Sequence, residues 1–344
     1  MINRFKILSS LLCSFLLISC YAQKPTDSVA DKMLVYQLEN GGWPKQLEDK
    51  SVVNYSLPLT GELLAKIKAT TVLHATFDNK ATSREIVHLV QAYKTTKNDA
   101  YLKAAEKGLD YTLSAQNANG GWPQYYPDKA LYRAQITYND DAMVNILNIL
   151  QDIITKANGF DAVNPKYIPK AQLAVKNGLT CILKTQVKQN DALTIWAAQY
   201  DKDSMLPAKA RNFEPASLST AESVSIVRFL MRFPNPSAEI KTSISSAIKW
   251  FEKYKISGYR FDRNTSKAEG KITALVADNN STVWARFYDL DKNIPIFGDR
   301  DNTIKLKLED LSTERRNGYA WYGNFAQKLL EKEYPKWLSA NAIN

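Results

Sequence analysis

A repeated loop motif constrains the fold of this chain more than any other feature. The segment QLENGGWP, which begins at Gln37, returns as QNANGGWP, which begins at Gln116. A degraded third copy runs from Gln186 to Trp196. Recurrence at a regular interval predicts a fold assembled from similar structural units.

Amphipathic helices are predicted between the copies of this motif. Apolar residues at helical spacing mark one helix face in each interval: Ile86, Val87, Leu89, Val90 and Tyr93; Met143, Ile146, Leu147, Leu150 and Ile154; Val224, Val227, Phe229, Leu230 and Met231. Partner helices fit near residues 98–116, 168–187 and 241–255. We therefore expect a mainly α fold, an α/α toroid in which helix pairs form an incomplete, three-fold ring. Long irregular loops and minor short strands, at residues 273–276 and 294–297, would complete it.

Each of these helices follows a polar start. The starts are Asp78-Asn79, Asn139-Asp140-Asp141 and the segment from Ser219 to Glu222. In a ring of helix pairs, the starts of the inner helices gather at one mouth. Carboxylates at a helix start either cap free N–H groups or bind a cation, and for Asp140 and Asp141 both interpretations stay open.

The N-terminal segment predicts export. Arg4 and Lys6 precede an apolar run, residues 7–18, that is too short to span a membrane as a mature helix. The following residues resemble a bacterial lipobox in which Cys20 is lipidated, and ordinary cleavage near residues 21–23 stays open. We expect a signal peptide at 1–19, a polar tether at 20–32 and one catalytic domain at 33–344. The protein would be periplasmic or at the cell surface, with a lipid anchor as its only membrane contact.

The formal net charge of +10 favours polyanions as partners, such as nucleic acid, lipid headgroups or acidic polysaccharide. Export and the lack of a recognisable nucleic-acid motif argue against nucleic acid. His74 and His88 are the only two histidines, and their spacing suggests neither a metal cluster nor a Ser–His pair. The sequence also has no P-loop or dinucleotide fingerprint.

Five motifs in order carry a family resemblance. They are NGGWPQYYP, ITYNDDAM, PAKARNFEPASLSTAESVSIVRFLM, VWARFYDLDKNIPIFGDRD and ERRNGYAWYG. Together, from about Met33 to Tyr322, the chain resembles the family 10 pectate lyases. The resemblance implies calcium-dependent cleavage of α-1,4-polygalacturonate (pectate) by β-elimination, which gives 4,5-unsaturated oligogalacturonates in pectin catabolism.

That chemistry defines what the site must contain. The proton to be removed is α to a carboxylate and very weakly acidic, so Ca²⁺ and cationic side chains must stabilise the developing charge. The resemblance implies Asp78 and Asp141 as Ca²⁺ ligands, with Asp140 as an alternative that would otherwise contact substrate. It implies Arg211 as the base, although free arginine has a pKa above ~12. Arg211 would either lose its proton transiently or position a hydroxide, and both roles stay open. An ion pair of Arg211 with Asp201, Asp203 or Glu214 stays open.

Further residues are candidates for binding the sugar acid. Arg286 and Arg300 suit a uronate carboxylate, because a guanidinium donates two parallel hydrogen bonds. Asn79 and Lys209 are candidates by adjacency, and Arg315 and Arg316 either bind carboxylates or cap a helix. Aromatic faces for sugar stacking, or for ordinary packing, are offered by Trp122, Tyr126 and Trp284.

Three other functions compete with the lyase. A non-catalytic uronate-binding lipoprotein would keep the arginines and aromatic faces without needing Asp78, Asp141 and Arg211 together. A polysaccharide hydrolase on the same toroid would use Asp140, Asp141 or Glu222 as acid and base. A terpene-cyclase-like toroid would need an aspartate-rich motif that the sequence lacks. A single toroid has no need of a partner, so we expect a monomer.

Overall fold

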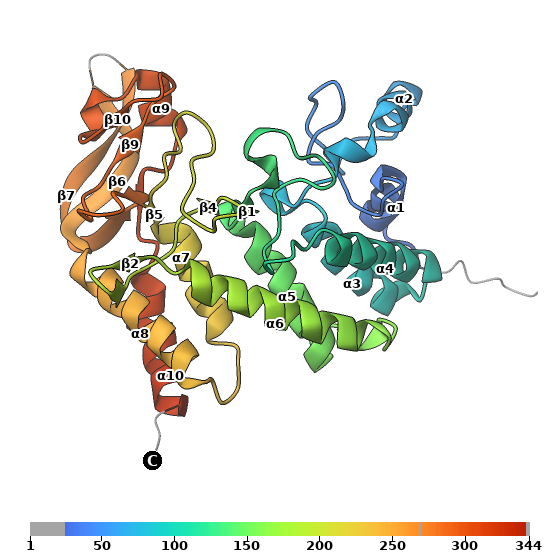
Figure 1. Ribbon diagram of the computed structural model, residues 1–344. Coiled ribbons are helices and arrows are strands. Elements are labelled where there is room, and N and C mark those ends of the chain that lie inside the picture. Colours follow the sequence, from blue (N-terminus) through green and yellow to red (C-terminus); the bar gives the residue numbers. More distant parts are fainter. Residues whose placement is uncertain (1–24, 268–269, 342–344) are drawn as a thin grey trace, which may run out of the picture.

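Six helices form the body of the protein as three consecutive pairs (Figure 1). The computed structural model describes residues 25–267 and 270–341. The pairs are α3 (Ser83–Thr96) with α4 (Asp99–Ser114), α5 (Ala142–Thr155) with α6 (Tyr167–Thr185), and α7 (Thr220–Leu230) with α8 (Ala238–Lys253). Most of the apolar residues predicted from helical spacing are buried or half-buried in these pairs, although Val87 is exposed, so the helices themselves lie where the pattern predicts them.

The helix pairs form an open row, and the predicted α/α toroid is wrong. Helix α5 packs between α3 and α7, and α6 packs between α4 and α8. The first and third pairs therefore lie at opposite ends of the row (Figure 1). Other segments cover those ends: α1 (Ser28–Tyr36) packs on α3 and α4, and Arg228 of α7 pairs with Glu333 from the C-terminal segment. Both ends of the row are thus covered by segments that lie outside the three helix pairs.

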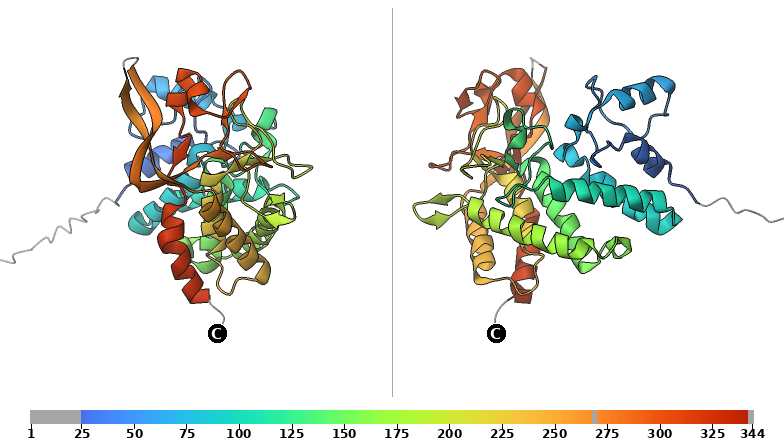
Figure 2. Two further views of the ribbon diagram at one scale, coloured as in Figure 1. Left: turned by 90° about the vertical axis from the view of Figure 1, so that its left-hand side faces the viewer. Right: turned by 45° about the vertical axis from the view of Figure 1, so that its right-hand side comes forward.

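A long β-hairpin is the second departure from the prediction. Strands β6 (Ile256–Lys267) and β7 (Gly270–Ala285) pair antiparallel, and β11 (Tyr322–Gly323) extends the sheet. The hairpin stands at one end of the molecule, opposite α1 and α2 (Gly61–Ala69), as the right-hand view of Figure 2 shows. The predicted strand at 273–276 lies inside β7, and of 294–297 only Phe297 is in a strand. Polar residues dominate much of both strands, so the sequence has little apolar–polar alternation to reveal them.

The remaining elements are short. Two-residue strands form the pairs β1 (Ile136–Thr137) with β4 (Gln199–Tyr200), β2 (Lys188–Gln189) with β3 (Ala192–Leu193), β5 (Leu218–Ser219) with β8 (Phe287–Tyr288), and β9 (Phe297–Gly298) with β10 (Ile304–Lys305). Near the C-terminus lie α9 (Thr313–Gly318), a π-helical turn (Leu329–Glu333) and α10 (Tyr334–Asn341).

The repeated motif ties each loop to the helix before it. In all three copies the tryptophan indole N–H donates to a carbonyl near the end of the preceding helix: Trp43 to Met33 (2.7 Å), Trp122 to Thr112 (2.9 Å) and Trp196 to Ile182 (2.8 Å). The motif glutamine bridges the same loop to a later helix in every copy. The degraded third copy is therefore a structural copy. Losing the indole bond of Trp122 would leave the buried Thr112 carbonyl without this partner, at about 1–3 kcal/mol.

A fourth copy is hidden by an insertion. The indole of Trp284 donates to the Phe251 carbonyl near the end of α8 (2.9 Å), as in the other copies. The β6–β7 hairpin lies between these two residues, so the spacing in the sequence gives no sign of the repeat.

The motif glycines are required where loop and helix touch. Gly120 has φ +90°, and a Cβ there would lie 2.1 Å from the Asn177 carbonyl oxygen. Gly41 has φ +94°, and its Cβ would lie 2.3 Å from the Lys107 carbonyl oxygen. Any other residue at either position would clash with a helix backbone.

The N-terminal boundary differs from the prediction. Asp27 caps α1, and Ala30 and Met33 are buried, so from Ser28 onward the expected polar tether is folded. The predicted signal peptide and Cys20 lie outside the described residues. No helix in the described part of the chain is long and apolar enough to cross a membrane.

Candidate active site

Two matching turns precede α3 and α5 and lie against each other. Each is a 3₁₀ turn, Asp78–Lys80 and Asn139–Asp141, whose last two residues have left-handed backbone: φ is 50° and 63° in the first turn, and 53° and 60° in the second. Each turn is anchored by a loop from the next repeat, because Phe77 N–H donates to the Gln124 carbonyl and Tyr138 N–H to the Ala198 carbonyl. The repeat therefore brings two of the predicted polar starts together.

The aspartates at these starts do not cap the helices. The N-cap residue of α3 is Thr82, and neither it nor Asp141 at the start of α5 makes a side-chain capping bond. The capping interpretation is therefore wrong for these carboxylates. Asp78 instead pairs with the Lys45 ammonium, and Asp140 accepts from the Asn139 amide (3.0 Å).

The carboxylates are crowded enough to favour a cation. Burial, with the charges of Asp78 and Glu222, raises the pKa of Asp140 to about 6. Burial also raises the pKa of Asp141, with Glu222 adding to the effect. The buried Asp78 Oδ1 has no hydrogen-bond partner. A hard cation such as Ca²⁺ takes oxygen ligands of this kind, so these residues fit one.

The protein side chains do not complete a metal shell. Within residues 25–267 and 270–341, no group of three or more His, Cys, Asp or Glu side chains is placed to hold a metal ion. A Ca²⁺ ion needs six to eight oxygen ligands in all. Here it would need oxygens from water, from the backbone or from a bound sugar acid.

Arg286 lies beside this cluster because of strand pairing. Strand β8 pairs with β5, and the Thr220 N–H donates to the Arg286 carbonyl (3.0 Å), which sets Arg286 at the start of α7. Its half-buried guanidinium pairs with the buried Glu222 and lies over the Tyr319 ring, 5.2 Å from the centroid. The Arg286 Nε has no partner.

Arg211 forms an ion pair with Glu214, one of the three partners left open by the sequence. Its Nε lies 2.7 Å from Glu214 Oε2 and its Nη2 lies 2.5 Å from Oε1. These hydrogen bonds raise the pKa of Arg211 above its ordinary value. The Tyr319 hydroxyl donates to the same Glu214 carboxylate (3.1 Å). Tyr319 therefore links Arg211 with Arg286. Through these contacts the carboxylate cluster is connected to Arg211.

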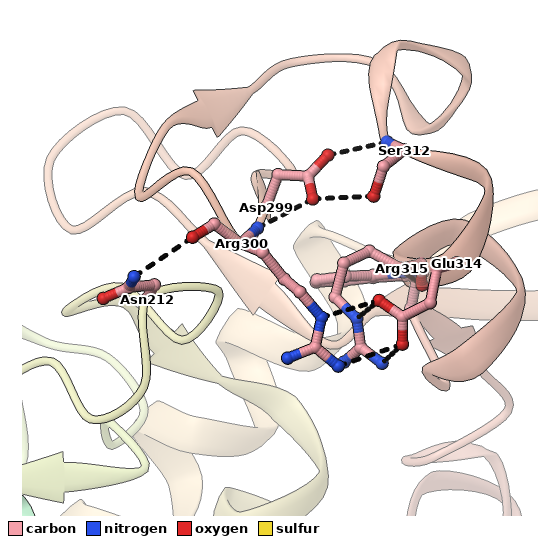
Figure 3. Close-up of polar contacts among 7 residues, drawn as sticks. Asn212, Asp299, Arg300, Ser312, Glu314 and Arg315 are labelled. Atoms are coloured by element: carbon pink, nitrogen blue, oxygen red, sulfur yellow. Dashed lines mark hydrogen bonds and ion pairs between the residues drawn. The ribbon is translucent and has the colours of Figure 1, made fainter.

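Three guanidiniums surround the ring of Phe213. Those of Arg211, Arg300 and Arg315 lie 4.6, 5.4 and 4.4 Å from the ring centroid. Figure 3 shows Arg300 and Arg315 converging on the carboxylate of Glu314. Arg315 thus belongs to this cluster. Its neighbour Arg316 does not line it, and the Arg316 Nε is buried without a partner.

A cavity of about 680 Å³ opens at this arginine cluster. Its lining consists of Leu131, Tyr132, Gln135, residues 209–213 and Arg300. Lys209 is exposed and donates to Asn302 (3.3 Å), and Asn79 is exposed on its turn. The carboxylates Asp78, Asp140 and Asp141 do not line this cavity. Contacts from Glu222 through Arg286, Tyr319 and Glu214 lead to Arg211 in its lining.

The tryptophans predicted as sugar platforms are core residues. Trp122 and Trp284 are fully buried and hydrogen-bonded to helix carbonyls, so no face of either ring is free. Tyr126 is half-buried and packs edge-on against Tyr111. Its neighbour Tyr125, which the same loop also offers for sugar stacking, contacts the Arg133 guanidinium and the Lys45 ammonium with its ring.

Two residues in the network were missed for identifiable reasons. Phe213 comes two residues after Arg211, and only the structure shows that arginines gather around its ring. Lys45 comes two residues after Trp43, in the motif itself, and comparison of that position across the copies would have singled it out.

Comparison with known proteins identifies the family. The pectic acid lyase family model matches residues 37–330. A family 10 polysaccharide lyase from Cellvibrio cellulosa is 33% identical with a TM-score of 0.82, and the match covers 91% of this chain and 92% of that one. An aspartate-to-alanine mutant of the family 10 lyase from that organism, in complex with trigalacturonic acid, is 32% identical with a TM-score of 0.81, covering 92% and 93%. No curated protein sequence matches the chain. The resemblance carried by the five motifs is thus confirmed, and the chain belongs to the pectic acid lyase family, as a polysaccharide lyase of family 10.

Proposed function

We propose that this lyase is calcium-dependent and cleaves α-1,4-polygalacturonate by β-elimination, giving 4,5-unsaturated oligogalacturonates. The observation that carries the proposal is one continuous network of charge. It runs from the crowded carboxylates, with the unpartnered Asp78 Oδ1, to the guanidiniums around Phe213. The complex of the Cellvibrio cellulosa lyase mutant with trigalacturonic acid supports the same substrate class.

Asp78 and Asp141 would hold the Ca²⁺ ion, with Asp140 facing it and the substrate. When bound, Ca²⁺ supplies positive charge that neutralises the uronate carboxylate and acidifies the proton next to it. Burial of these side chains strengthens that effect, because charges interact more strongly away from water.

Arg286 and Arg300 would bind uronate carboxylates. Arg286 is held rigidly by Glu222 and keeps its Nε free for a further acceptor. The Arg300 side chain is 61% exposed, and its two hydrogen bonds to Glu314 form the fork that a sugar carboxylate would accept. Glu314 occupies this fork in the structure, so a uronate carboxylate would have to take its place.

Arg211 is the proposed acceptor of the C5 proton. As the C5–H bond breaks, its electron pair forms the C4=C5 double bond, the C4–O bond breaks, and the leaving oxygen takes up a proton. Glu214 holds Arg211 in its charged form, because the ion pair raises the pKa of Arg211. Arg211 therefore has to leave Glu214 and lose its proton to solvent before it acts, and nearby cationic charge favours the neutral form.

Product analysis on polygalacturonate tests the proposal. A lyase produces ultraviolet absorbance from the unsaturated uronide, and a calcium chelator should abolish it. Release of reducing ends without absorbance would indicate a hydrolase using Asp140, Asp141 or Glu222. Retardation in a pectate-containing gel with neither product would indicate a binding protein.

We further propose that the protein is exported and anchored through lipidated Cys20. The support is the basic, then apolar N-terminal sequence that ends in the lipobox-like residues 17–20. Expression in a bacterial host with radiolabelled palmitate should label the wild-type protein and leave Cys20→Ser unlabelled. Equal labelling of both proteins would contradict the proposal.

A further inference from the structure

A lysine lies where the proposed cation would be expected to bind. The Lys45 ammonium pairs with Asp78 Oδ2. The other oxygen of the same carboxylate, Oδ1, is buried and has no hydrogen-bond partner. The Asp78 side chain is only 6% exposed, and the Lys45 side chain is 27% exposed. The ion pair is therefore mostly buried, with one route to solvent along the lysine.

The repeat shows that this lysine is not a general feature of the loop. The second residue after the tryptophan is Lys45, Gln124, Ala198 and Arg286 in the four copies. The last three use their backbone carbonyls in a similar way: they accept the N–H of Phe77, Tyr138 and Thr220, respectively. Cations occur only in the two outer copies, and each pairs with a carboxylate at a helix start: Lys45 with Asp78, and Arg286 with Glu222.

The two outer cations differ in how firmly they are held. Arg286 is anchored by Glu222, by its position beside β8 and by the Tyr319 ring. Lys45 has a flexible stem and one carboxylate partner, and the Tyr125 ring lies 6.0 Å from its ammonium as a second resting place. Of the two, Lys45 is the cation that an incoming ion displaces more easily.

We propose that Lys45 is the resident counter-ion of Asp78, which a calcium ion must displace in order to bind. This inference rests on the proposed calcium dependence. Lys45 keeps the carboxylate cluster partly neutral in the metal-free protein, and it weakens calcium binding until a sugar acid adds its own oxygens. Lys45 is thus a positioning residue that makes calcium binding depend on substrate.

Calcium titration calorimetry on the metal-free protein tests this inference. Without sugar, Lys45→Met should bind calcium at least about tenfold more tightly than wild type, because a like charge within about 4 Å of the ion is removed. Lys45→Arg keeps the charge and should stay within about threefold of wild type. Lys32→Met is the matched control, since half-buried Lys32 donates to the Tyr55 carbonyl, and it should bind calcium as wild type does.

Thermal denaturation provides a second readout on the same proteins. In chelator, Lys45→Met should melt below wild type, because the Asp78 charge has lost its partner. Its rise in melting temperature on adding calcium should exceed that of wild type. If Lys45→Met does not fold, Lys45→Gln takes its place in both measurements.

The outcomes separate this inference from the proposed function. Unchanged or weaker calcium binding by Lys45→Met, with wild type binding calcium in the presence of trigalacturonate, overturns the role of Lys45 and leaves the proposed function intact. Absence of calcium binding by wild type, with trigalacturonate present, overturns the calcium dependence and this inference with it.

Discussion

The two ends of the candidate active site are built in different ways. At the carboxylate end, Asp78 and Asp140 lie on matching turns that the repeat places side by side. At the arginine end, the parts come from non-repeating loops, as where the Asn212 amide donates to the Arg300 carbonyl (3.0 Å; Figure 3). The first arrangement follows from the repeat, whereas the second depends on contacts between distant parts of the chain.

The electrostatics of the two ends also differ. The carboxylate end holds like charges close together, and burial raises the pKa of both Asp140 and Asp141. At the arginine end, Arg211 pairs with Glu214, and Arg300 shares Glu314 with Arg315. The carboxylate end therefore favours a further cation, whereas the arginine end already holds carboxylates where a uronate would bind.

The largest effect is expected at Arg211, where the arginine end reaches the chemistry. Arg211→Lys keeps a positive charge but not the guanidine that we propose as proton acceptor, so kcat should fall by about 10²–10⁴-fold, the usual contribution of a general base. Affinity for trigalacturonate should change little. Initial rates from ultraviolet absorbance, with calorimetry for binding, give both values. Full activity in Arg211→Lys would remove Arg211 as the base.

The next effect concerns stability where the two ends meet. Glu222→Gln leaves the Arg286 guanidinium partly buried without a carboxylate, which should lower the free energy of unfolding by about 3 kcal/mol. Glu252→Gln, on the exposed ion pair with Lys255, is the matched control and should change stability much less. Urea denaturation measures both. Equal effects would mean that burial does not distinguish the two ion pairs.

Calcium affinity should depend on pH through the carboxylate end alone. Because the pKa of Asp140 is raised to about 6, the metal-free folded protein takes up a proton there as the pH falls through that value, before the unfolded chain does. This proton competes with calcium, so calcium affinity should fall by up to about tenfold per unit below pH 6. Calorimetry from pH 5 to 8 measures the slope. Asp140→Asn should flatten it, and an unchanged slope in that variant would assign the proton elsewhere.

The smallest effect is expected at the exposed edge of the arginine end. Arg300→Lys loses the two-pronged contact with a carboxylate, so KM for polygalacturonate should rise by about three- to tenfold while kcat stays near wild type. Steady-state kinetics measures both values. A fall in kcat with unchanged KM would place Arg300 in the chemical step instead.

The sequence predicted the repeating part of the molecule well, for a physical reason. The helices follow local periodicity, and the Gly-Gly-Trp loops follow a local motif, so both can be read from short stretches. The arrangement of the helix pairs in an open row could not be predicted from short stretches. Whether helix pairs close into a ring depends on contacts between distant parts of the chain, and here α1 and the C-terminal segment cover the two ends of the row.

The candidate site likewise contains residues that the sequence reveals and residues that it does not. Asp78, Asp140 and Asp141 stand out as polar starts of amphipathic helices. The sequence alone does not show that their side chains make no capping hydrogen bonds. The Glu214 partner of Arg211 was one of three open choices. Glu314 and Phe213 act through side-chain contacts that no spacing reveals. The prediction of Trp122 as a sugar platform was wrong, because an aromatic residue in a glycine-rich loop can pack in the core as readily as it can bind a sugar.

The central claim is that a cation at the carboxylate end and guanidiniums at the arginine end together neutralise one bound sugar acid. A crystal structure of Arg211→Lys with trigalacturonate and Ca²⁺ tests it most directly. We expect density for an ion that contacts Asp78, Asp141 and a uronate carboxylate, with Arg286 or Arg300 on a carboxylate of the same sugar chain. A trigalacturonate bound away from these aspartates, with no ion between them, would contradict the account.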